Sequence, residues 1–278
     1  MDAAPQWPQA VAVELQFVGY FFWLSKEIGW MLLVPVIAIP AGMAAVICIC
    51  TAAFHRSRSP PERFLPLGME AVWISANFVW MVAELLYDTP EQQTPWAMTP
   101  MLKPDEARYS RAVWVAQVGF VAVVVGWFAT TGYCWVAYRG SASRVAYEAV
   151  VSAALSGSIA FWAMKDLFWS TGHLFPAVGC DVVAVVFLLS SGAHESGEGV
   201  AGLSRVDGIW TMWSLSNFTW ILCELAFHGN LWWRFASAAI AAAALALLVT
   251  SYSAMQDRSE KQGVAVECDE DQQLVQRN

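Results

Sequence analysis

Two short motifs, each present twice, hold the residues of this chain whose types and spacing suit chemistry. In the first motif, tryptophans flank a lysine and an acid, as in Trp23-x2-Lys26-Glu27-x2-Trp30 and Trp162-x2-Lys165-Asp166-x2-Trp169. In the second, tryptophans alternate with an asparagine and a glutamate, as in Trp73-x3-Asn77-x2-Trp80-x3-Glu84 and Trp213-x3-Asn217-x2-Trp220-x3-Glu224. Carboxylates beside indole faces favour an organic cation, especially an amine. Carboxylates with amide oxygens suit a hydrated alkali ion or a proton instead, and the residues do not choose between these ligands.

The spacing within the second motif places its residues on one face of a helix. Positions 73, 77, 80 and 84 follow a 4-3-4 spacing, as do positions 213, 217, 220 and 224. Asn and Glu facing lipid would be costly, so we expect these faces to turn toward each other or toward a cavity. The predicted site comprises four acids, two asparagines, two lysines and four tryptophans: Glu27, Glu84, Asp166, Glu224, Asn77, Asn217, Lys26, Lys165, Trp23, Trp80, Trp162 and Trp220.

Four acids and two lysines give this predicted site a formal charge of −2. The acids share a Trp-x3-acid spacing on helices expected to run in one direction, which predicts that they lie at similar depth. Two like charges about 8 Å apart repel by roughly 2 kcal/mol at an effective dielectric of about 20. A bound cation, protonation of one or two acids, or pairing with the lysines would relieve this repulsion.

Anchoring and packing are the competing interpretations of the motif residues. Trp and Lys are enriched at membrane interfaces, and this interpretation is preferred for Trp30 and Trp169, which lie beyond the acids. Buried Asn can also lock helix pairs together without any ligand. The motifs therefore predict either a ligand site or a set of helix contacts.

Acids outside the motifs have less specific interpretations. Glu70 lies near the predicted start of its helix, where a carboxylate complements the helix dipole. Asp181 lies inside an apolar run without a duplicate in the first half, and a functional and a packing role are equally open. The interpretation given to Glu70 also applies to Glu14, Glu148 and Asp207.

The composition identifies the elements that must position these residues. Of the 278 residues, 58% are apolar and 14% are charged, and the mean hydropathy is +0.47. A soluble domain has about 45–50% apolar and about 25% charged residues. The chain is therefore expected to be an all-α, multi-pass membrane helix bundle with the lipid bilayer as its partner. Soluble enzymes and disordered regulators are excluded, and a net charge of −8 excludes nucleic-acid binders.

About eight apolar runs are long enough to cross a bilayer, which needs roughly 20 residues per helix. The division between the first two rests only on Lys26, Glu27 and Gly29, and without a turn there the count falls to seven. Pro35 and Pro40 are expected to kink the second run. The predicted spans are 9–28, 31–54, 66–88, 109–138, 144–170, 174–192, 205–228 and 231–256.

Both motifs recur at almost one offset, 139 residues from Trp23 to Trp162 and 140 from Trp80 to Trp220. Between segments 73–85 and 213–225, six of thirteen positions are identical. A common offset for two unrelated motifs predicts two duplicated four-helix halves, residues 1–140 and 141–256. Because each half has an even number of spans, the two halves would have the same orientation in the membrane.

The loops and the end of the chain predict the orientation. Arginines concentrate in the loops on the side that holds both termini, so the positive-inside rule places both termini in the cytosol. Residues 257–278 are polar and acidic, which predicts a disordered cytosolic tail. The six cysteines lack the spacing of a disulfide framework or a metal site and are interpreted as small buried residues.

Several classes of chemistry lack their sequence signals, and we expect no cofactor. The histidines fall at predicted helix ends or in loops, no lysine suits a retinal Schiff base, and HExxH, GxxxxGK[ST] and GxSxG are absent. The first hypothesis is a transporter or channel that handles a cation, amine or proton at the predicted site. The second is a structural or sensory membrane protein whose polar stripes set helix packing. A membrane-embedded enzyme acting on a lipid through paired carboxylates ranks last.

Overall fold

The computed structural model describes residues 7–57, 61–87, 105–139, 156–196, 205–227 and 230–253. Within these ranges the chain forms eight helices and no strand, so the predicted all-α fold class is confirmed. The helices are α1 (Trp7–Met31), α2 (Pro35–Arg56), α3 (Pro61–Tyr87), α4 (Glu106–Tyr138), α6 (Gly157–Ser170), α7 (Leu174–Ser196), α8 (Arg205–Leu225) and a last helix, Leu231–Ser253.

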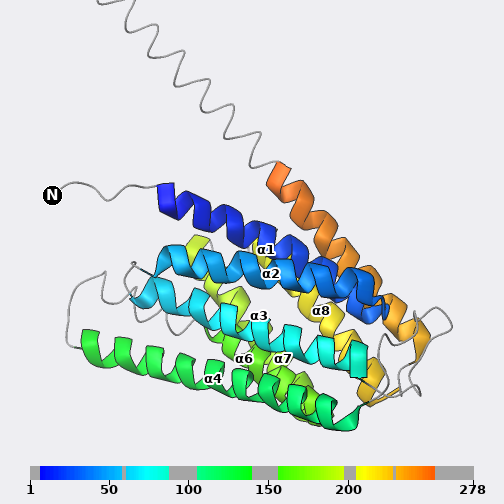
Figure 1. The fold of residues 1–278 in the computed structure, drawn as a ribbon. Coiled ribbons are helices and arrows are strands. Elements are labelled where there is room, and N and C mark those ends of the chain that lie inside the picture. The colour runs from blue at the N-terminus through cyan, green and yellow to red at the C-terminus, as the bar shows by residue number, and fades with distance from the viewer. Residues whose placement is uncertain are drawn as a thin grey trace, which may run out of the picture.

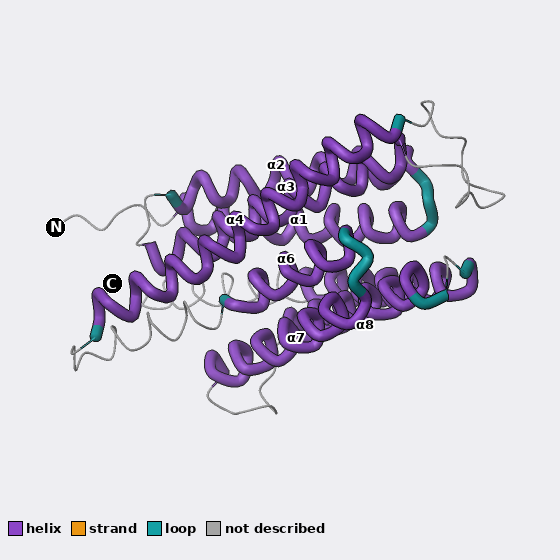
Figure 2. Tube along the Cα trace, turned by 90° about the horizontal axis from the view of Figure 1, so that it is seen from below, coloured by secondary structure: helices purple, strands orange, loops and turns teal. Residues whose placement is uncertain are grey.

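Successive helices pack against one another around a shared interior. Figure 1 shows α1 to α4 side by side in chain order, with α6, α7 and α8 behind them. In the view of Figure 2, α2 and α3 lie along one side and α7 and α8 along the other, with α1 and α6 between them. Phe17 of α1 stacks on Tyr252 of the last helix, with ring centroids 4.3 Å apart. This contact joins the two ends of the helix series.

Inner and outer helices alternate along the chain. The four inner helices, α1, α3, α6 and α8, carry both motifs and bury their tryptophans. The outer helices carry large apolar side chains that face outward, such as Trp114 (64% exposed), Phe175 (86%) and Trp232 (80%). Such an apolar exterior suits contact with lipid rather than water.

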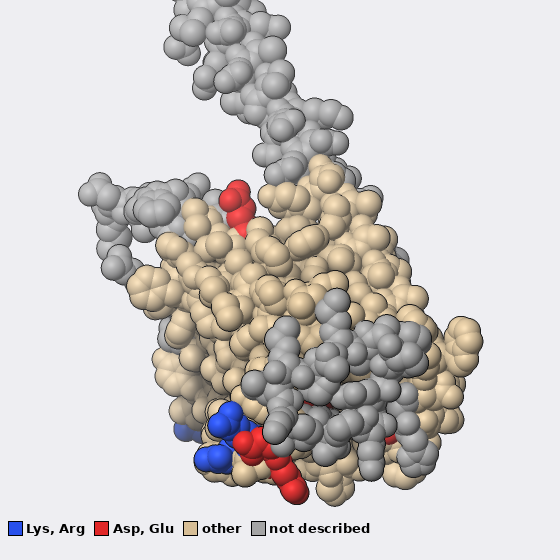
Figure 3. Space-filling view, turned by 45° about the vertical axis from the view of Figure 1, so that its right-hand side comes forward, with Lys and Arg blue, Asp and Glu red and all other residues tan. Residues whose placement is uncertain are grey.

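Four of the described helices are long and apolar enough to cross a membrane: Pro35–Arg56, Phe64–Tyr87, Glu106–Tyr138 and Leu231–Ser253. They identify the chain as a membrane protein. The helices α1 and α8 are outside this set because their Trp, Asn, Lys and acidic residues lower their mean hydropathy. On the face shown in Figure 3, the visible charged side chains lie at the upper and lower margins, with an uncharged belt between them.

The first two helices are separate, but the turn between them differs from the prediction. The helix α1 continues through Gly29 to Met31, and the turn lies at residues 32–34. A Cβ on Gly29 would lie 2.8 Å from the backbone nitrogen of Ala38, so this glycine allows α2 to pack closely. Pro35 begins α2, where a proline loses no hydrogen bond, so the expected kink at Pro35 is wrong.

The two copies of the Lys–acid motif end their helices in the same way. After α1, the N–H of Leu33 bonds the Trp30 carbonyl at 2.9 Å, and the N–H of Val34 bonds the Gly29 carbonyl at 2.8 Å. After α6, the corresponding bonds, at 2.9 and 2.8 Å, run from Gly172 to Trp169 and from His173 to Phe168. Both are Schellman motifs, in which one residue adopts a positive φ. That residue is Leu33 (φ 55°) in the first copy and Gly172 (φ 75°) in the second.

Parts of the sequence prediction lie outside the described residues. Of the predicted span 144–170, only residues 156–170 are described, and the predicted tail 257–278 lies wholly outside. Glu148 lies outside as well. Each predicted half, 1–140 and 141–256, is therefore described only in part.

Candidate functional site

Two layers of four tryptophans cross the interior, with one tryptophan from each inner helix in each layer. Ring centroids of contacting neighbours lie 5.0–6.4 Å apart in the first layer and 4.7–6.4 Å apart in the second. Aromatic pairs at such distances contribute about 0.5–1.5 kcal/mol each beyond their burial. The first Trp layer is Trp23, Trp73, Trp162 and Trp213, and the second Trp layer is Trp30, Trp80, Trp169 and Trp220.

A layer of polar side chains lies between the two Trp layers. All of its members are at most 3% exposed. This arrangement follows from the sequence, because each inner helix has two tryptophans seven residues apart, with its polar residues one turn from either. The polar layer consists of Lys26, Glu27, Asn77, Lys165, Asp166 and Asn217.

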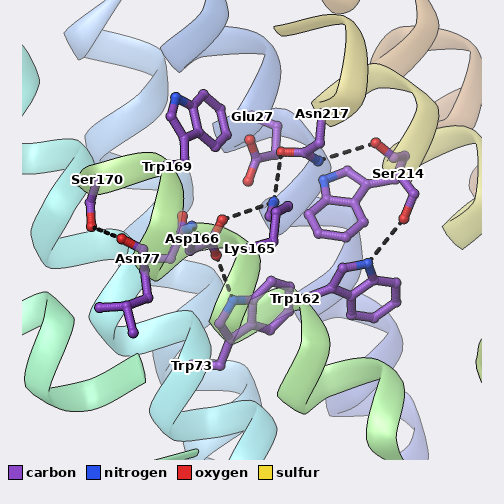
Figure 4. Close-up of polar contacts among 12 residues, drawn as sticks. Glu27, Trp73, Asn77, Trp162, Lys165, Asp166, Trp169, Ser170, Ser214 and Asn217 are labelled. Carbon is purple, nitrogen blue, oxygen red and sulfur yellow. Dashed lines mark hydrogen bonds and ion pairs between the residues drawn. The ribbon is translucent and has the colours of Figure 1, made fainter. Parts of the chain in front are cut away.

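Each lysine of the polar layer holds the acid beside it and the asparagine of a neighbouring helix. Lys26 Nζ lies 2.7 Å from Glu27 Oε1 and donates to Asn77 Oδ1 at 2.6 Å. In the second copy, Lys165 Nζ lies 2.8 Å from Asp166 Oδ1 and donates to Asn217 Oδ1 at 3.2 Å (Figure 4). With two lysines and two acids, the formal charges of this layer cancel.

The lysines also lie between indole rings, the surroundings in which the sequence predicted an organic cation. Lys26 Nζ lies 3.7 Å from the ring centroid of Trp23 and 4.7 Å from that of Trp30. Lys165 Nζ lies 5.4 Å from Trp169 and 5.1 Å from Trp213. Each ammonium group is therefore a tethered cation between the two Trp layers.

The four predicted acids do not lie at one depth. Glu27 and Asp166 belong to the polar layer, whereas Glu84 and Glu224 accept hydrogen bonds from the second Trp layer. Trp30 Nε1 donates to Glu84 at 2.9 Å, and Trp169 Nε1 donates to Glu224 at 3.0 Å. Helical spacing fixes the face on which a residue lies but not the axial offset between neighbouring helices. The shared Trp-x3-acid spacing therefore predicted the wrong relative depth for the acids.

The four tryptophans of the predicted site belong to both Trp layers, whereas the anchor interpretation of Trp30 and Trp169 is wrong. Trp23 and Trp162 lie in the first Trp layer, and Trp80 and Trp220 lie in the second. Trp30 and Trp169 are 1% and 4% exposed and contact each other in the second Trp layer. They are therefore core residues and not interfacial anchors.

The two copies differ in how their acids are satisfied. Asp166 Oδ2 accepts the Trp73 indole N–H at 2.7 Å and the Asn77 amide at 3.1 Å (Figure 4). The equivalent donors for Glu27 would be Trp213 and Asn217, but Asn217 donates to the carbonyl of Trp213 on its own helix instead. Glu27 Oε2 and Trp213 Nε1 are buried without a hydrogen-bond partner. The first-copy acid therefore keeps unused hydrogen-bonding capacity in the apolar interior.

Beside the first Trp layer lies a pocket of about 130 Å³, lined by side chains from all four inner helices. Glu70 lines it and is 6% exposed. It is the tenth residue of α3, so its interpretation as a partner of the helix dipole is wrong. The sequence carries the signal that was missed, because Glu70 extends the motif stripe of α3 by one further step, three residues before Trp73.

Asp181 lies apart from the polar layer. It is 3% exposed, and one of its oxygens is buried without a hydrogen-bond partner. It lines an apolar groove of about 390 Å³ together with Thr211 and Ser214 of α8. Among the described residues, no three His, Cys, Asp or Glu side chains come together as a metal site.

The chain matches no known family model, no curated protein and no solved structure. Any function must therefore be argued from the geometry of these layers and pockets.

Proposed function

We propose that the chain is a membrane transporter or channel for a cation, amine or proton, with the polar layer as the selective part of its pathway. The observation that carries this proposal is the burial of two lysines and two acids, each at most 1% exposed, in the centre of an apolar bundle. Ionisable groups at such positions are expensive and are typical of ion pathways and proton relays.

The proposed pathway continues on both sides of the polar layer. On one side, Glu84 and Glu224 lie against the second Trp layer. On the other side, the pocket at Glu70 lies against the first Trp layer. Trp73 of that layer lines the pocket, and its indole N–H donates to Asp166. Acidic groups therefore occur at three successive levels along the inner helices.

In this proposal, the two lysines close the pathway. Their ammonium groups lie between the Trp layers and neutralise the acids that a passing cation would use. The unpartnered Glu27 oxygen is the position at which a proton or cation would first bind within the polar layer.

Eight spans in two duplicated halves, residues 1–140 and 141–256, also belong to this proposal, with both termini in the cytosol. The repeated Lys–Asn bonds, the repeated Trp–Glu bonds and the matching Schellman motifs support the duplication. An even number of spans per half would relate the halves by an axis along the membrane normal, as in parallel-repeat transporters.

The test is flux through the purified full-length chain in vesicles of phosphatidylcholine and phosphatidylglycerol. Proton flux is followed with an entrapped pH dye, and cation flux is followed by uptake of labelled tetramethylammonium. We expect Glu27→Gln and Asp166→Asn to lower the flux by at least about tenfold, since each removes a buried charge from the pathway. The matched control, Glu106→Gln, changes an exposed acid at the start of α4 and should leave flux unchanged. Equal flux in vesicles with and without the protein would refute the proposal.

A structural role is the second candidate, and one observation favours it. The lysines already satisfy the acids and the indole faces, so the polar layer can hold four helices together without any ligand. Under this alternative, the same isosteric variants lower the free energy of unfolding, and the wild-type vesicles show no flux.

A further inference from the structure

The pocket at Glu70 holds a buried acid that forms no ion pair among the described residues, and the charge of Arg56 acts on it only from a distance. It lies on the side of the first Trp layer from which the inner helices begin. Glu70 Oε2 accepts a hydrogen bond from Gln16 at 3.3 Å, and Gln16 also donates to the Tyr20 hydroxyl. No ion pair involves Glu70 among the described residues, whereas both acids of the polar layer have a lysine. A buried carboxylate with only neutral donors is costly unless a cation reaches it.

The rest of the pocket wall is largely aromatic. Tyr20 and Trp210 meet edge to face with ring centroids 4.7 Å apart, and Trp210 lies 5.7 Å from Trp162. Trp162 in turn stacks on Trp73 at 5.7 Å, which completes a continuous run of four rings. The first half supplies Glu70. Trp210 stands at the equivalent position of the second half, 140 residues later. The two halves are therefore not interchangeable here, and they form one site.

We propose that this pocket binds a small organic ammonium ion, with its charge against Glu70 and its methyl or methylene groups against the aromatic rings. The inference rests on the proposed function and names the ligand class of its entry site. A cavity of about 130 Å³ is slightly smaller than an apolar cavity of about 150 Å³ that can hold benzene, which suits a cation of few heavy atoms. A bare alkali ion would need several oxygen ligands, whereas five of the eight lining side chains have no oxygen and are indole or aliphatic groups.

The position of Trp73 links this pocket to the polar layer. Its ring lines the pocket, and its indole N–H donates to Asp166 at 2.7 Å. An ammonium ion in the pocket would therefore contact the side chain that donates to Asp166, the partner of Lys165. Binding at Glu70 is therefore expected to alter the hydrogen bonding of the polar layer through one side chain.

The test is equilibrium binding of labelled tetramethylammonium to the full-length protein in detergent, at constant ionic strength. We expect saturable binding that neopentyl alcohol, a neutral molecule of similar size, does not displace. Glu70→Gln should weaken binding by about tenfold or more, because it removes the only charge in the lining. Trp210→Leu should weaken it by roughly threefold to thirtyfold, the range of one cation–π contact. The control Asp181→Asn neutralises a buried acid outside the pocket and should bind like the wild type.

Two outcomes would overturn the inference: no saturable binding to the wild type, or binding unchanged in both pocket variants. If Glu70→Gln does not fold, the affinity of Trp210→Leu for tetramethylammonium tests the inference instead. The flux experiment separates this inference from the proposed function. Glu70-dependent binding without flux supports the pocket and refutes transport. Flux that Asp166→Asn abolishes but Glu70→Gln leaves intact, with unaltered binding, supports transport and refutes the pocket.

Discussion

The two lysine–acid pairs are costly to bury, and their geometry decides whether they stabilise the protein. Lys26 and Glu27 are 0% and 1% exposed, and the ammonium group contacts Glu27, Asn77 and the Trp23 ring. Attraction inside a bundle offsets desolvation only when such contacts are nearly complete. Removing one member of a pair therefore costs far more than the net contribution of the pair.

Replacing Lys26 by Met should destabilise the protein by about 3–5 kcal/mol, because Glu27 then loses its buried counter-charge. Adding Glu27→Gln to that variant should recover most of the loss. The measurement is equilibrium unfolding in mixed detergent micelles, followed by circular dichroism.

The exposed pair Arg108–Asp105 provides the control for that comparison. Its side chains are 60% and 38% exposed, so Arg108→Met should change the free energy of unfolding by less than about 1 kcal/mol. If Lys26→Met lowered the free energy of unfolding as little as Arg108→Met, the lysine would not be needed to stabilise the interior.

The sequence identified the interior residues but not their partners. The stripes at Asn77 and Asn217 were expected to face inward, and both asparagines are buried in the polar layer. The division of the acids between two depths was not predictable from the Trp-x3-acid spacing. The recurrence of Trp-x6-Trp in all four inner helices does carry that information, since two residues seven apart lie about 10.5 Å apart along a helix.

At the scale of elements, the approximate helix positions were predicted well because charged residues separate the apolar runs of the sequence. The helix boundaries were predicted less well because packing between helices decides them. The sequence suggested a turn at Gly29, whereas the chain uses this glycine for close contact with α2 and turns at Leu33. A glycine can serve either purpose, and only the neighbouring helix shows which.

The Schellman motif after α6 gives a prediction at this scale. Gly172 has φ 75°, and a Cβ there would meet no atom within 4 Å, so Gly172→Ala introduces backbone strain alone. We expect a loss of about 1–2 kcal/mol in the free energy of unfolding. Gly179→Ala, inside α7 and equally free of close neighbours, should instead stabilise the protein by about 0.5–1 kcal/mol. Changes of the same sign in both variants would contradict the assignment of a left-handed helix terminus at Gly172.

At the scale of the whole molecule, contacts between distant segments arrange the inner helices around one interior. Trp73 of α3 bonds Asp166 of α6, across 93 residues of chain. Ser216 of α8 bonds the Ser237 carbonyl of the last helix at 2.8 Å. The sequence predicted helices and an offset near 140, but no local pattern could specify which helices would meet. Assembly of the site therefore depends on the complete bundle rather than on either half of the sequence.

The proposed eight spans make a prediction about the two ends of the chain. Phe17, the eleventh residue of α1, stacks on Tyr252, one residue before the end of the last helix, so the last helix ends beside the N-terminal half of α1. An even number of crossings then places both termini on one side of the membrane, and the positive-inside rule makes that side the cytosol. Seven crossings would place the termini on opposite sides.

Short epitope tags at each terminus test this topology in cells. Both tags should be inaccessible to antibody in intact cells and should become accessible together when the plasma membrane is permeabilised. A tag inserted in the segment 88–104, between α3 and α4, serves as the control, since three crossings separate it from the N-terminus and should leave it on the opposite face. If the two terminal tags differed in accessibility, one of the eight helices would not cross the bilayer. The eight-span topology, with an even number of crossings in each half, would then fail.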